Sequence, residues 1–245
     1  MKLLDISGLT KRFGGLTAVN AVDITIERGE MIGLIGPNGS GKTTLFNCLT
    51  GLYTADSGKA LFKGVEITSM PSHRIAESGI ARTFQLARVF HQLTLFQNMC
   101  IAQSHQGEKV IATPLQSSGA ELGDAAHCWL DFVGLTGLKH EYAGDVSYGQ
   151  QKLLEFAMVL MSDPDLILLD EPTSGVNPVM INKIVPLIWN LNQQGKTLFI
   201  IEHNMDVVMK LCQRVCVLDY GEKIFEGIPE EVQRNPKVIE AYFGY

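Results

Sequence analysis

The sequence predicts an α/β fold with a mainly parallel central sheet, an antiparallel β subdomain and an inserted helical subdomain. Three short apolar runs, at residues 31–35, 166–169 and 198–201, are typical of strands buried on both faces. Helical patterns separate these runs, and such an alternation indicates the βαβ units of a doubly wound sheet. With 245 residues, the chain is long enough to bury a large core.

Antiparallel strands are expected where apolar and polar side chains alternate with a period of two. The runs with this character are 3–6, 22–27, 60–62 and 65–67. Lys63 and Gly64 lie between the last two runs and form a two-residue turn of the kind that closes a hairpin. These segments predict the β subdomain.

The end of the chain has a similar signal. Residues 215–218 and 223–225 flank Tyr220-Gly221 and predict a second hairpin. A short helix is expected over 229–234, and a last helix after Pro236.

The helical subdomain is predicted from a change in composition between Val89 and about His140, where charge is low and helical stretches are interrupted. The interrupting residues are Gly107, Pro114, Gly119 and Gly134. The expected division is therefore a core with its β subdomain at 1–88 and 141–245, and a helical insertion at about 89–140.

The charge balance excludes some classes of function. Lys and Arg number 20 against 26 Asp and Glu, so the formal net charge is −6, which argues against nucleic acid as a partner. No apolar run approaches the roughly 18 residues needed to cross a bilayer. Asp5 interrupts the start of the chain before an export signal could develop, so we expect a cytosolic protein.

The cysteines are expected to be reduced core residues, because they form no CxxC pair and no zinc quartet. They are Cys48, Cys100, Cys128, Cys212 and Cys216.

The strongest local motif spans residues 36–44, which match GxxxxGK[ST] between a buried strand pattern and a helix pattern. Its glycines allow backbone N–H groups to turn inward around a triphosphate. Lys42 can reach the β and γ oxygens, and Thr43 can place its hydroxyl on Mg²⁺. The candidate nucleotide-binding residues are Gly36, Pro37, Asn38, Gly39, Ser40, Gly41, Lys42, Thr43 and Thr44.

Polar residues that could complete this site follow the next two buried strands. Asp170 and Glu171 end one strand and point to opposite sides, so they are expected to have different roles. Asp170 is suited to hold Mg²⁺ through its water shell, and Glu171 to polarise a water in line with the γ-phosphate. His203 follows the strand at 198–201 and is expected beside the phosphates, because strand carboxyl ends line the ligand crevice of such sheets.

Two explanations remain open for the start of the helix after Val146. Ser147 and Gln150 have the spacing of a capping box, which accounts for both residues structurally. Gly149 lowers helix propensity in the first turn and leaves N–H groups accessible, as an anion site requires.

Taken together, these motifs resemble those of nucleotide-binding subunits of ATP-binding-cassette (ABC) transporters over essentially the whole chain. Phe13 matches the aromatic residue that family members stack on adenine. Gln85 matches the glutamine that reaches Mg²⁺ and the attacking water and relays the state of the site to the membrane subunits. Residues 174–178 match the segment that touches the opposite subunit.

By the same resemblance, Ser147, Gly149 and Gln150 belong to the family's signature stretch, which caps the γ-phosphate held by the other subunit of a dimer. The stretch departs from the usual pattern, with Val146 where Leu is common and Tyr148 where Gly is frequent. Neither difference argues against ATP use. The resemblance implies a P-loop ABC-ATPase core, ATP and Mg²⁺ as cofactors, and Glu171, His203 and Gln85 in catalysis.

Within the family, residues 81–85, 93–94 and 102–105 and the tail 236–243 resemble the larger ATP-binding subunit of importers for branched-chain amino acids. Urea and amide importers have similar endings and are the alternative. The implied partners are a second cassette, identical or different, transmembrane permease subunits and, indirectly, a solute-binding protein. The implied location is the cytoplasmic face of the plasma membrane.

Other P-loop classes fit less well. A kinase would share residues 36–43 but has no use for the helix at Ser147 or for Gln85. A chromosome-associated cassette would contain a long coiled coil, and no sustained heptads lie between Gln85 and Ser147. A regulatory, non-catalytic cassette would lack Glu171 or His203.

Overall fold

The structure is a computed structural model that describes residues 1–83, 89–104 and 119–243. The chain forms two compact units. The first, called the core unit, contains residues 1–82, 165–172 and 188–245, and the second, called the helical unit, contains residues 83–164 and 173–187. The bounds predicted for the helical insertion, 89 and 140, stay a prediction.

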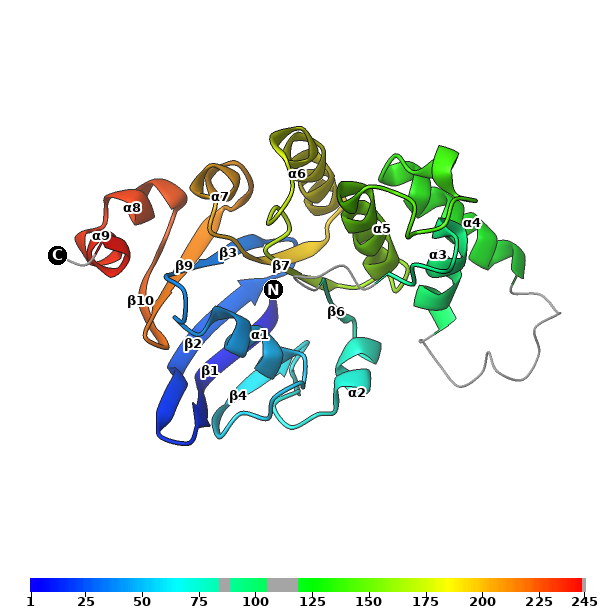
Figure 1. The fold of residues 1–245 in the computed structure, drawn as a ribbon. Helices are drawn as coiled ribbons and strands as arrows, with labels where there is room; N and C mark the ends of the chain where they lie inside the picture. The colour runs from blue at the N-terminus through cyan, green and yellow to red at the C-terminus, as the bar shows by residue number, and fades with distance from the viewer. Residues whose placement is uncertain (84–88, 105–118, 244–245) are drawn as a thin grey trace. The chain divides into compact units, whose positions relative to one another are not determined.

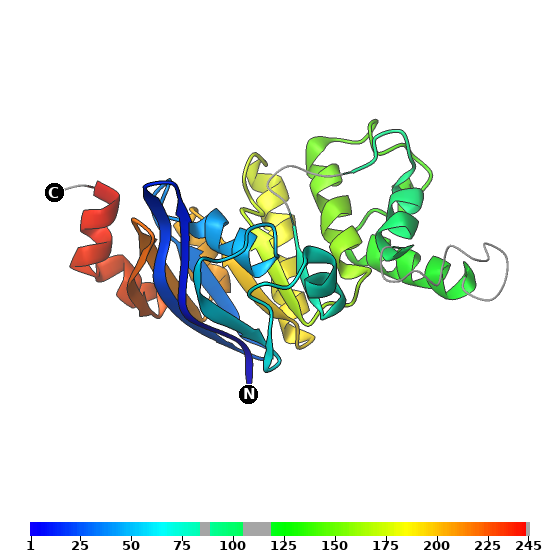
Figure 2. The same ribbon diagram turned by 90° about the horizontal axis from the view of Figure 1, so that it is seen from below.

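The antiparallel sheet of the core unit has the strand order β2-β1-β4-β5. Its strands are β1 (Lys2–Phe13), β2 (Leu16–Glu27), β4 (Ser57–Phe62) and β5 (Val65–Glu66). The predicted strands are present, but β1 and β2 extend much further, as the long dark-blue hairpin in Figure 2 shows. Register shifts interrupt their pairing after Ile6, which hid the alternation from the sequence pattern.

The second sheet has the order β10-β9-β3-β8-β7-β6 (Figure 1). Its strands are β3 (Met31–Ile35), β6 (Ile80–Arg82), β7 (Leu166–Asp170), β8 (Thr197–Ile201), β9 (Arg214–Asp219) and β10 (Glu222–Gly227). All neighbours are parallel except β9 and β10, which form the predicted hairpin. The mainly parallel sheet is confirmed, and every residue of β3, β7 and β8 is buried.

Helix α1 (Lys42–Leu49) shares one hydrophobic core with both sheets. Phe46 of α1 packs on Phe199 of β8 with ring centroids 5.0 Å apart. This packing fixes the start of α1 to the carboxyl end of the parallel sheet, where the predicted site lies.

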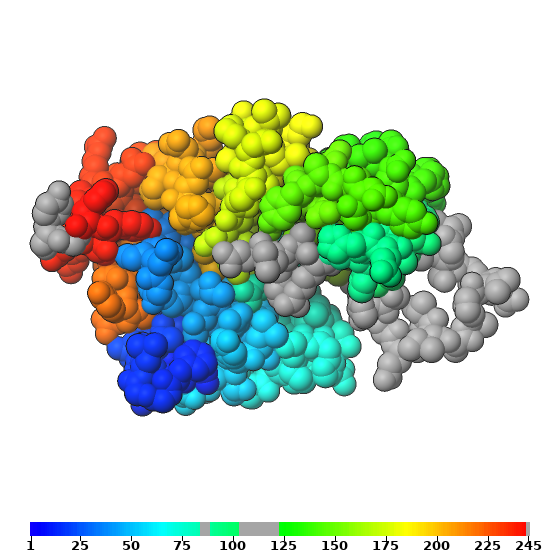
Figure 3. All heavy atoms as spheres, in the orientation of Figure 1, coloured from blue at the N-terminus to red at the C-terminus, as the bar shows by residue number. Residues whose placement is uncertain are grey.

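The remaining helices of the core unit are α2 (Ser72–Glu77), α7 (Met205–Leu211), α8 (Pro229–Arg234) and α9 (Pro236–Phe243). The two predicted helices at the chain end are therefore present. Helices α8 and α9 pack on β10, and the red and orange surfaces of these segments adjoin in Figure 3.

The helical unit contains α3 (Leu95–Ser104), α4 (Gly119–Phe132), the short 3₁₀ helix η1 (Thr136–Leu138) and α5 (Tyr148–Leu160), and α3, α4 and α5 pack on one another. Gly134 follows α4 with φ +72°, a left-handed conformation that suits glycine after a helix. Gly107 and Pro114 lie outside the described residues. Helix α6 (Pro178–Gln193) begins in the helical unit and ends in the core unit.

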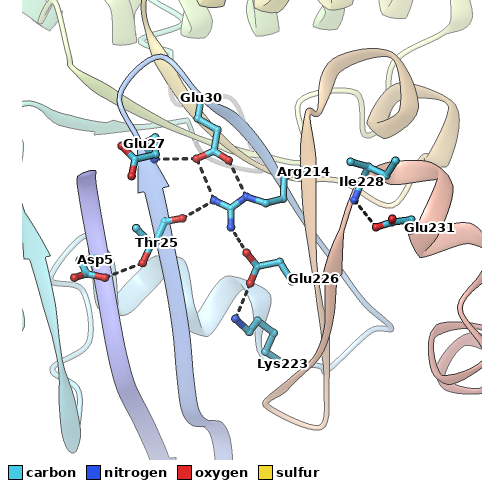
Figure 4. Close-up of polar contacts among 9 residues, drawn as sticks. All are labelled: Asp5, Thr25, Glu27, Glu30, Arg214, Lys223, Glu226, Ile228 and Glu231. Carbon is cyan, nitrogen blue, oxygen red and sulfur yellow. Dashed lines mark hydrogen bonds and ion pairs between the residues drawn. The ribbon is translucent and has the colours of Figure 1, made fainter. Parts of the chain in front are cut away.

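A network of charged side chains joins β2, β9 and β10 (Figure 4). Arg214 donates to Glu30 at 2.8 and 3.0 Å and to the Thr25 carbonyl oxygen at 2.5 Å. It also pairs with Glu226, which accepts a hydrogen bond from Lys223 at 2.6 Å. The network cross-links the antiparallel sheet to the edge of the parallel sheet.

The cysteine prediction is partly wrong. All five thiols are free, and Cys48, Cys212 and Cys216 are buried, but Cys128 is exposed. Helix α4 buries Ala126 and Leu130, which places Cys128 on the opposite side of the helix. Within the three described ranges, no helix is long and apolar enough to span a membrane.

Candidate functional site

The glycine-rich loop between β3 and α1 passes so close to neighbouring backbone that two of its glycines have no room for a side chain. A Cβ atom on Gly36 would lie 2.0 Å from the Leu218 carbonyl oxygen, and one on Gly41 would lie 2.2 Å from that of Ala18. Gly36, Gly39 and Gly41 also have φ values of +149°, +81° and +101°. The loop shape therefore requires glycine at these positions.

Lys42 is buried at the start of α1 and bends back over the loop. Its Nζ donates to the carbonyl oxygens of Gly36 and Pro37, each at 2.8 Å, and lies 3.3 Å from the Ser40 hydroxyl. The loop residues Asn38 and Gly39 are exposed. The ammonium group thus lies inside the loop. A bound phosphate could replace the two carbonyl oxygens as its hydrogen-bond acceptor.

The first turn of α1 presents N–H donors with no side-chain cap. Gly41 occupies the N-cap position, and the first turn contains no acidic residue. Thr43 is exposed and Thr44 half-buried in this turn. An anion at this end would meet both the helix dipole and the free first-turn N–H groups.

Opposing effects act on the pKa of Lys42. Burial lowers the pKa of Lys42, while the negative charges of Glu171 and Asp170 act in the opposite direction. These two carboxylates at the end of β7 are therefore close enough to influence the loop lysine, as the sequence predicts for one site.

Asp170 ends β7, and its carboxylate is buried against a cation. Its Oδ2 atom accepts a hydrogen bond from Arg82 of β6 at 2.6 Å. Another guanidinium nitrogen of Arg82 donates to the Asn47 side chain of α1, also at 2.6 Å. This contact of Arg82 was not predicted from the sequence. A signal for it was available, because Arg82 is a charged residue in a strand, β6, that pairs with the fully buried strand β7.

Glu171 leaves the strand in a left-handed conformation, with φ +49°. Its N–H donates to the Ile201 carbonyl oxygen at 2.9 Å, which holds the turn to the end of β8. A non-glycine residue in this region carries a strain of about 1 kcal/mol or more, and such strain is typical of functional positions. The two adjacent carboxylates have different partners, with Asp170 bound to Arg82 and Glu171 lying beside His203.

His203 lies beside Glu171, with Nδ1 and Oε2 3.9 Å apart. Its own backbone is held by the preceding residue. The buried Glu202 carboxylate accepts hydrogen bonds from the N–H groups of His203, at 2.9 Å, and Asn204, at 3.0 Å. Asn204 in turn caps α7. No pattern in the sequence indicated this role of Glu202.

Phe13 lies at the end of β1 and contacts Tyr53, with ring centroids 5.2 Å apart and planes at 75°. The ammonium of Lys11 lies 5.3 Å from the centre of the Phe13 ring. Asp56 accepts from Lys11 at 3.3 Å and from the Arg12 N–H at 2.6 Å. Tyr53 and Asp56 lie in the segment that follows α1. This segment therefore holds Phe13, the predicted base-stacking residue, in position.

The start of α5 in the helical unit is a capping box, as the spacing predicts. Gln150 donates its N–H to the Ser147 hydroxyl, and the Ser147 N–H donates to the Gln150 side chain at 2.8 Å. Gly149 has a packing reason as well, because a Cβ there would lie 2.6 Å from Met180 Cε. Packing on Met180 is an explanation that sequence reasoning did not offer.

The structure therefore brings residues 36–44, Asp170, Glu171 and His203 together in the core unit, at the carboxyl ends of β3, β7 and β8. Phe13 belongs to the same unit, and Ser147, Gly149 and Gln150 to the helical unit. Gln85 lies outside the described residues.

A glycine-rich loop between a buried strand and a helix, an acidic pair at the end of β7 and a histidine after β8 together match the pattern of a known family. Residues 19–174 match the family described as ABC transporter. The chain belongs to the ABC transporter family. Residues 222–245, which include β10 and α8, also match the family described as branched-chain amino acid ATP-binding cassette transporter.

Full-length relatives support this ABC transporter assignment. The chain is 41% identical to the high-affinity branched-chain amino acid transport ATP-binding protein BraF of Pseudomonas aeruginosa, covering 99% of this chain and 98% of BraF. It is 39% identical to LivG of Escherichia coli strain K12, with the same coverage. A solved ATP-binding cassette in its ADP conformation has a TM-score of 0.90 and 34% identity over the whole of both chains.

Proposed function

We propose that this chain is the ATP-hydrolysing motor subunit of an ABC importer for branched-chain amino acids. The observation that carries the proposal is the convergence of the Lys42 loop with Asp170, Glu171 and His203 at one edge of the parallel sheet. Such a site binds a triphosphate and places a carboxylate near it, which is what hydrolysis requires. In this proposal the transported solute does not bind to this chain.

In this proposal the chain's own groups hold ATP at its phosphates and at its adenine. The loop N–H groups and Lys42 bind the phosphates, and the N-terminal end of α1 adds its dipole. Phe13 stacks on adenine, supported by its contact with Tyr53.

Magnesium is the metal that fits the residues present. The hydroxyl of Thr43 and the carboxylate of Asp170 are oxygen donors, which Mg²⁺ prefers, and Gln85 would add an amide oxygen. In the described part of the chain, no cluster of three or more His, Cys, Asp or Glu side chains could hold a metal. When bound, Mg²⁺ would neutralise charge on the β- and γ-phosphates.

Glu171 accepts a proton from the attacking water in the proposed reaction. Its side chain is about one-fifth exposed, so a water molecule can reach it. His203 is more exposed and lies within reach of the same carboxylate, which suits a residue that orients water and the γ-phosphate.

A second cassette, identical or different, completes each site in this proposal. Ser147, Gly149 and Gln150 would cap the γ-phosphate bound by the other subunit, so that ATP closes the pair and hydrolysis reopens it. Closure moves transmembrane permease subunits, to which a solute-binding protein delivers the amino acid. This role places the subunit on the cytoplasmic face of the plasma membrane.

A radiolabelled ATP assay tests the reaction class. We expect inorganic phosphate in the presence of Mg²⁺, whereas a labelled metabolite would indicate a kinase. Reconstitution with the permease subunits and separate leucine and urea uptake assays then tests the solute, since urea or amide importers are the alternative. Leucine uptake that requires ATP supports the proposal, and uptake of urea alone contradicts it.

A further inference from the structure

Arg82 and Asp170 form a deeply buried ion pair at the proposed site. The side chains are only 6% and 5% exposed. Arg82 is bound at more than one point, because it also donates to Asn47 and its guanidinium carbon lies 5.6 Å from the centre of the Phe46 ring. The guanidinium is therefore held in place between the end of β7 and helix α1.

The contact with Arg82 reduces the negative charge that a metal cation would meet at Asp170. A buried carboxylate attracts a divalent cation mainly through its negative charge, and a guanidinium at 2.6 Å offsets that charge. The other nearby cation, Lys42, is engaged with the loop carbonyl oxygens of Gly36 and Pro37. Without nucleotide, a metal would thus meet a carboxylate whose charge is already compensated by Arg82.

A triphosphate alters this balance, because it adds several negative charges beside Lys42 and Thr43. A bound metal would then be held mainly by the phosphates, and Asp170 would be needed only to orient its water shell. The fixed Arg82 contact would hold the Asp170 carboxylate in a defined position for that purpose.

We propose that Arg82 is a positioning residue that supplies the counter-charge of Asp170, so that the metal site accepts a divalent cation only together with nucleotide. This inference rests on the proposed function, in which Thr43 and Asp170 hold Mg²⁺. Arg82 touches neither substrate nor metal and acts through Asp170.

The test measures binding of Mn²⁺ to nucleotide-free protein by electron paramagnetic resonance. Arg82→Gln removes the charge and keeps an amide that can donate to Asp170. We expect this variant to bind Mn²⁺ about tenfold more tightly than the parent. Arg82→Lys retains the charge and should stay within about twofold of the parent.

Two controls make the result specific. Arg74→Gln changes an exposed arginine that pairs with Glu77 on α2, and it should leave Mn²⁺ affinity unchanged. Adding Asp170→Asn to Arg82→Gln should abolish the gain. Parental affinity in Arg82→Gln, or a gain that persists without the Asp170 charge, would overturn the proposal.

The loss of a buried ion-pair partner can also unfold a protein. If Arg82→Gln is unfolded without metal by circular dichroism, Mn²⁺ should restore its fold as the replacement counter-charge. A chain that stays unfolded in millimolar Mn²⁺ contradicts the proposal.

Calorimetry of the parent with Mg·ATP separates the two hypotheses. A parent that does not bind ATP refutes the proposed function. A parent that binds ATP, together with an Arg82→Gln variant that binds Mn²⁺ no better, refutes only the role of Arg82.

Discussion

The Oε2 atom of Glu171 lies 3.9 Å from Nδ1 of His203, across the ends of the neighbouring strands β7 and β8. Glu171 reaches this position from a left-handed backbone conformation that the sheet imposes through its N–H bond to Ile201. The geometry therefore places the Glu171 carboxylate and the His203 imidazole side by side at the proposed nucleotide site.

Glu171→Gln should leave ATP affinity within about threefold of the parent and reduce turnover by about two to four orders of magnitude. Glutamine preserves the size of the side chain but cannot accept the proton from water. Phosphate release and calorimetry measure the two effects. Glu77→Gln, on the exposed α2, is the control, and a parental rate in Glu171→Gln would exclude this residue as the base.

Lys42→Ala should weaken Mg·ATP binding by about tenfold or more, because the ammonium is the charged donor inside the loop. Titration calorimetry measures the change. Lys59→Ala is the matched control, since Lys59 is an exposed lysine of β4 in the same unit. Equal affinities in the two variants would contradict the assignment of the loop.

The two explanations for Ser147 can be separated with two substitutions. Ser147→Ala removes the cap and should cost about 1 kcal/mol of stability, whereas Ser147→Asp keeps a good cap and should cost much less. If Ser147 also contacts a γ-phosphate in a dimer, the negative charge in Ser147→Asp should abolish turnover. Thermal melts and phosphate release report the two roles; an active, stable Ser147→Asp would leave only the cap.

The features predicted correctly from the sequence are those that depend only on residues close together in the chain. The Lys63-Gly64 and Tyr220-Gly221 turns are present, with positive φ at all four positions. The capping box at Ser147 and the buried strand before the glycine-rich loop are equally local. Each of these features is decided within a few residues of chain, where periodicity and turn chemistry act.

What the sequence could not predict depends on contacts between distant residues. Arg82 and Asp170 are 88 positions apart, and nothing near either residue indicates the pair. The three-residue strand β6 is too short for a periodic pattern. Tyr53 meets Phe13 because the segment after α1 folds back on the β1–β2 hairpin, an arrangement that only the tertiary structure decides.

The Arg214 network gives a prediction for stability against pH. Burial by itself raises the pKa of Glu226, but the hydrogen bonds and charges of Lys223 and Arg214 outweigh it and lower the pKa below its usual 4.5. A carboxyl group with a lowered pKa in the folded state stabilises the fold above its unfolded pKa. That contribution is lost as pH falls through the lower, folded pKa.

Glu226→Gln should therefore reduce the free energy of unfolding by about 1 to 2 kcal/mol at pH 7, because Arg214 and Lys223 lose a charged acceptor. The difference from the parent should shrink as pH falls from 4.5 through the lower folded pKa of Glu226, where the parent's own carboxyl group becomes protonated. Urea titrations across this range measure it, with Glu66→Gln on the exposed strand β5 as control. A difference that stays constant down to the lowest pH at which the chain folds would show that Glu226 contributes through packing rather than through its charge.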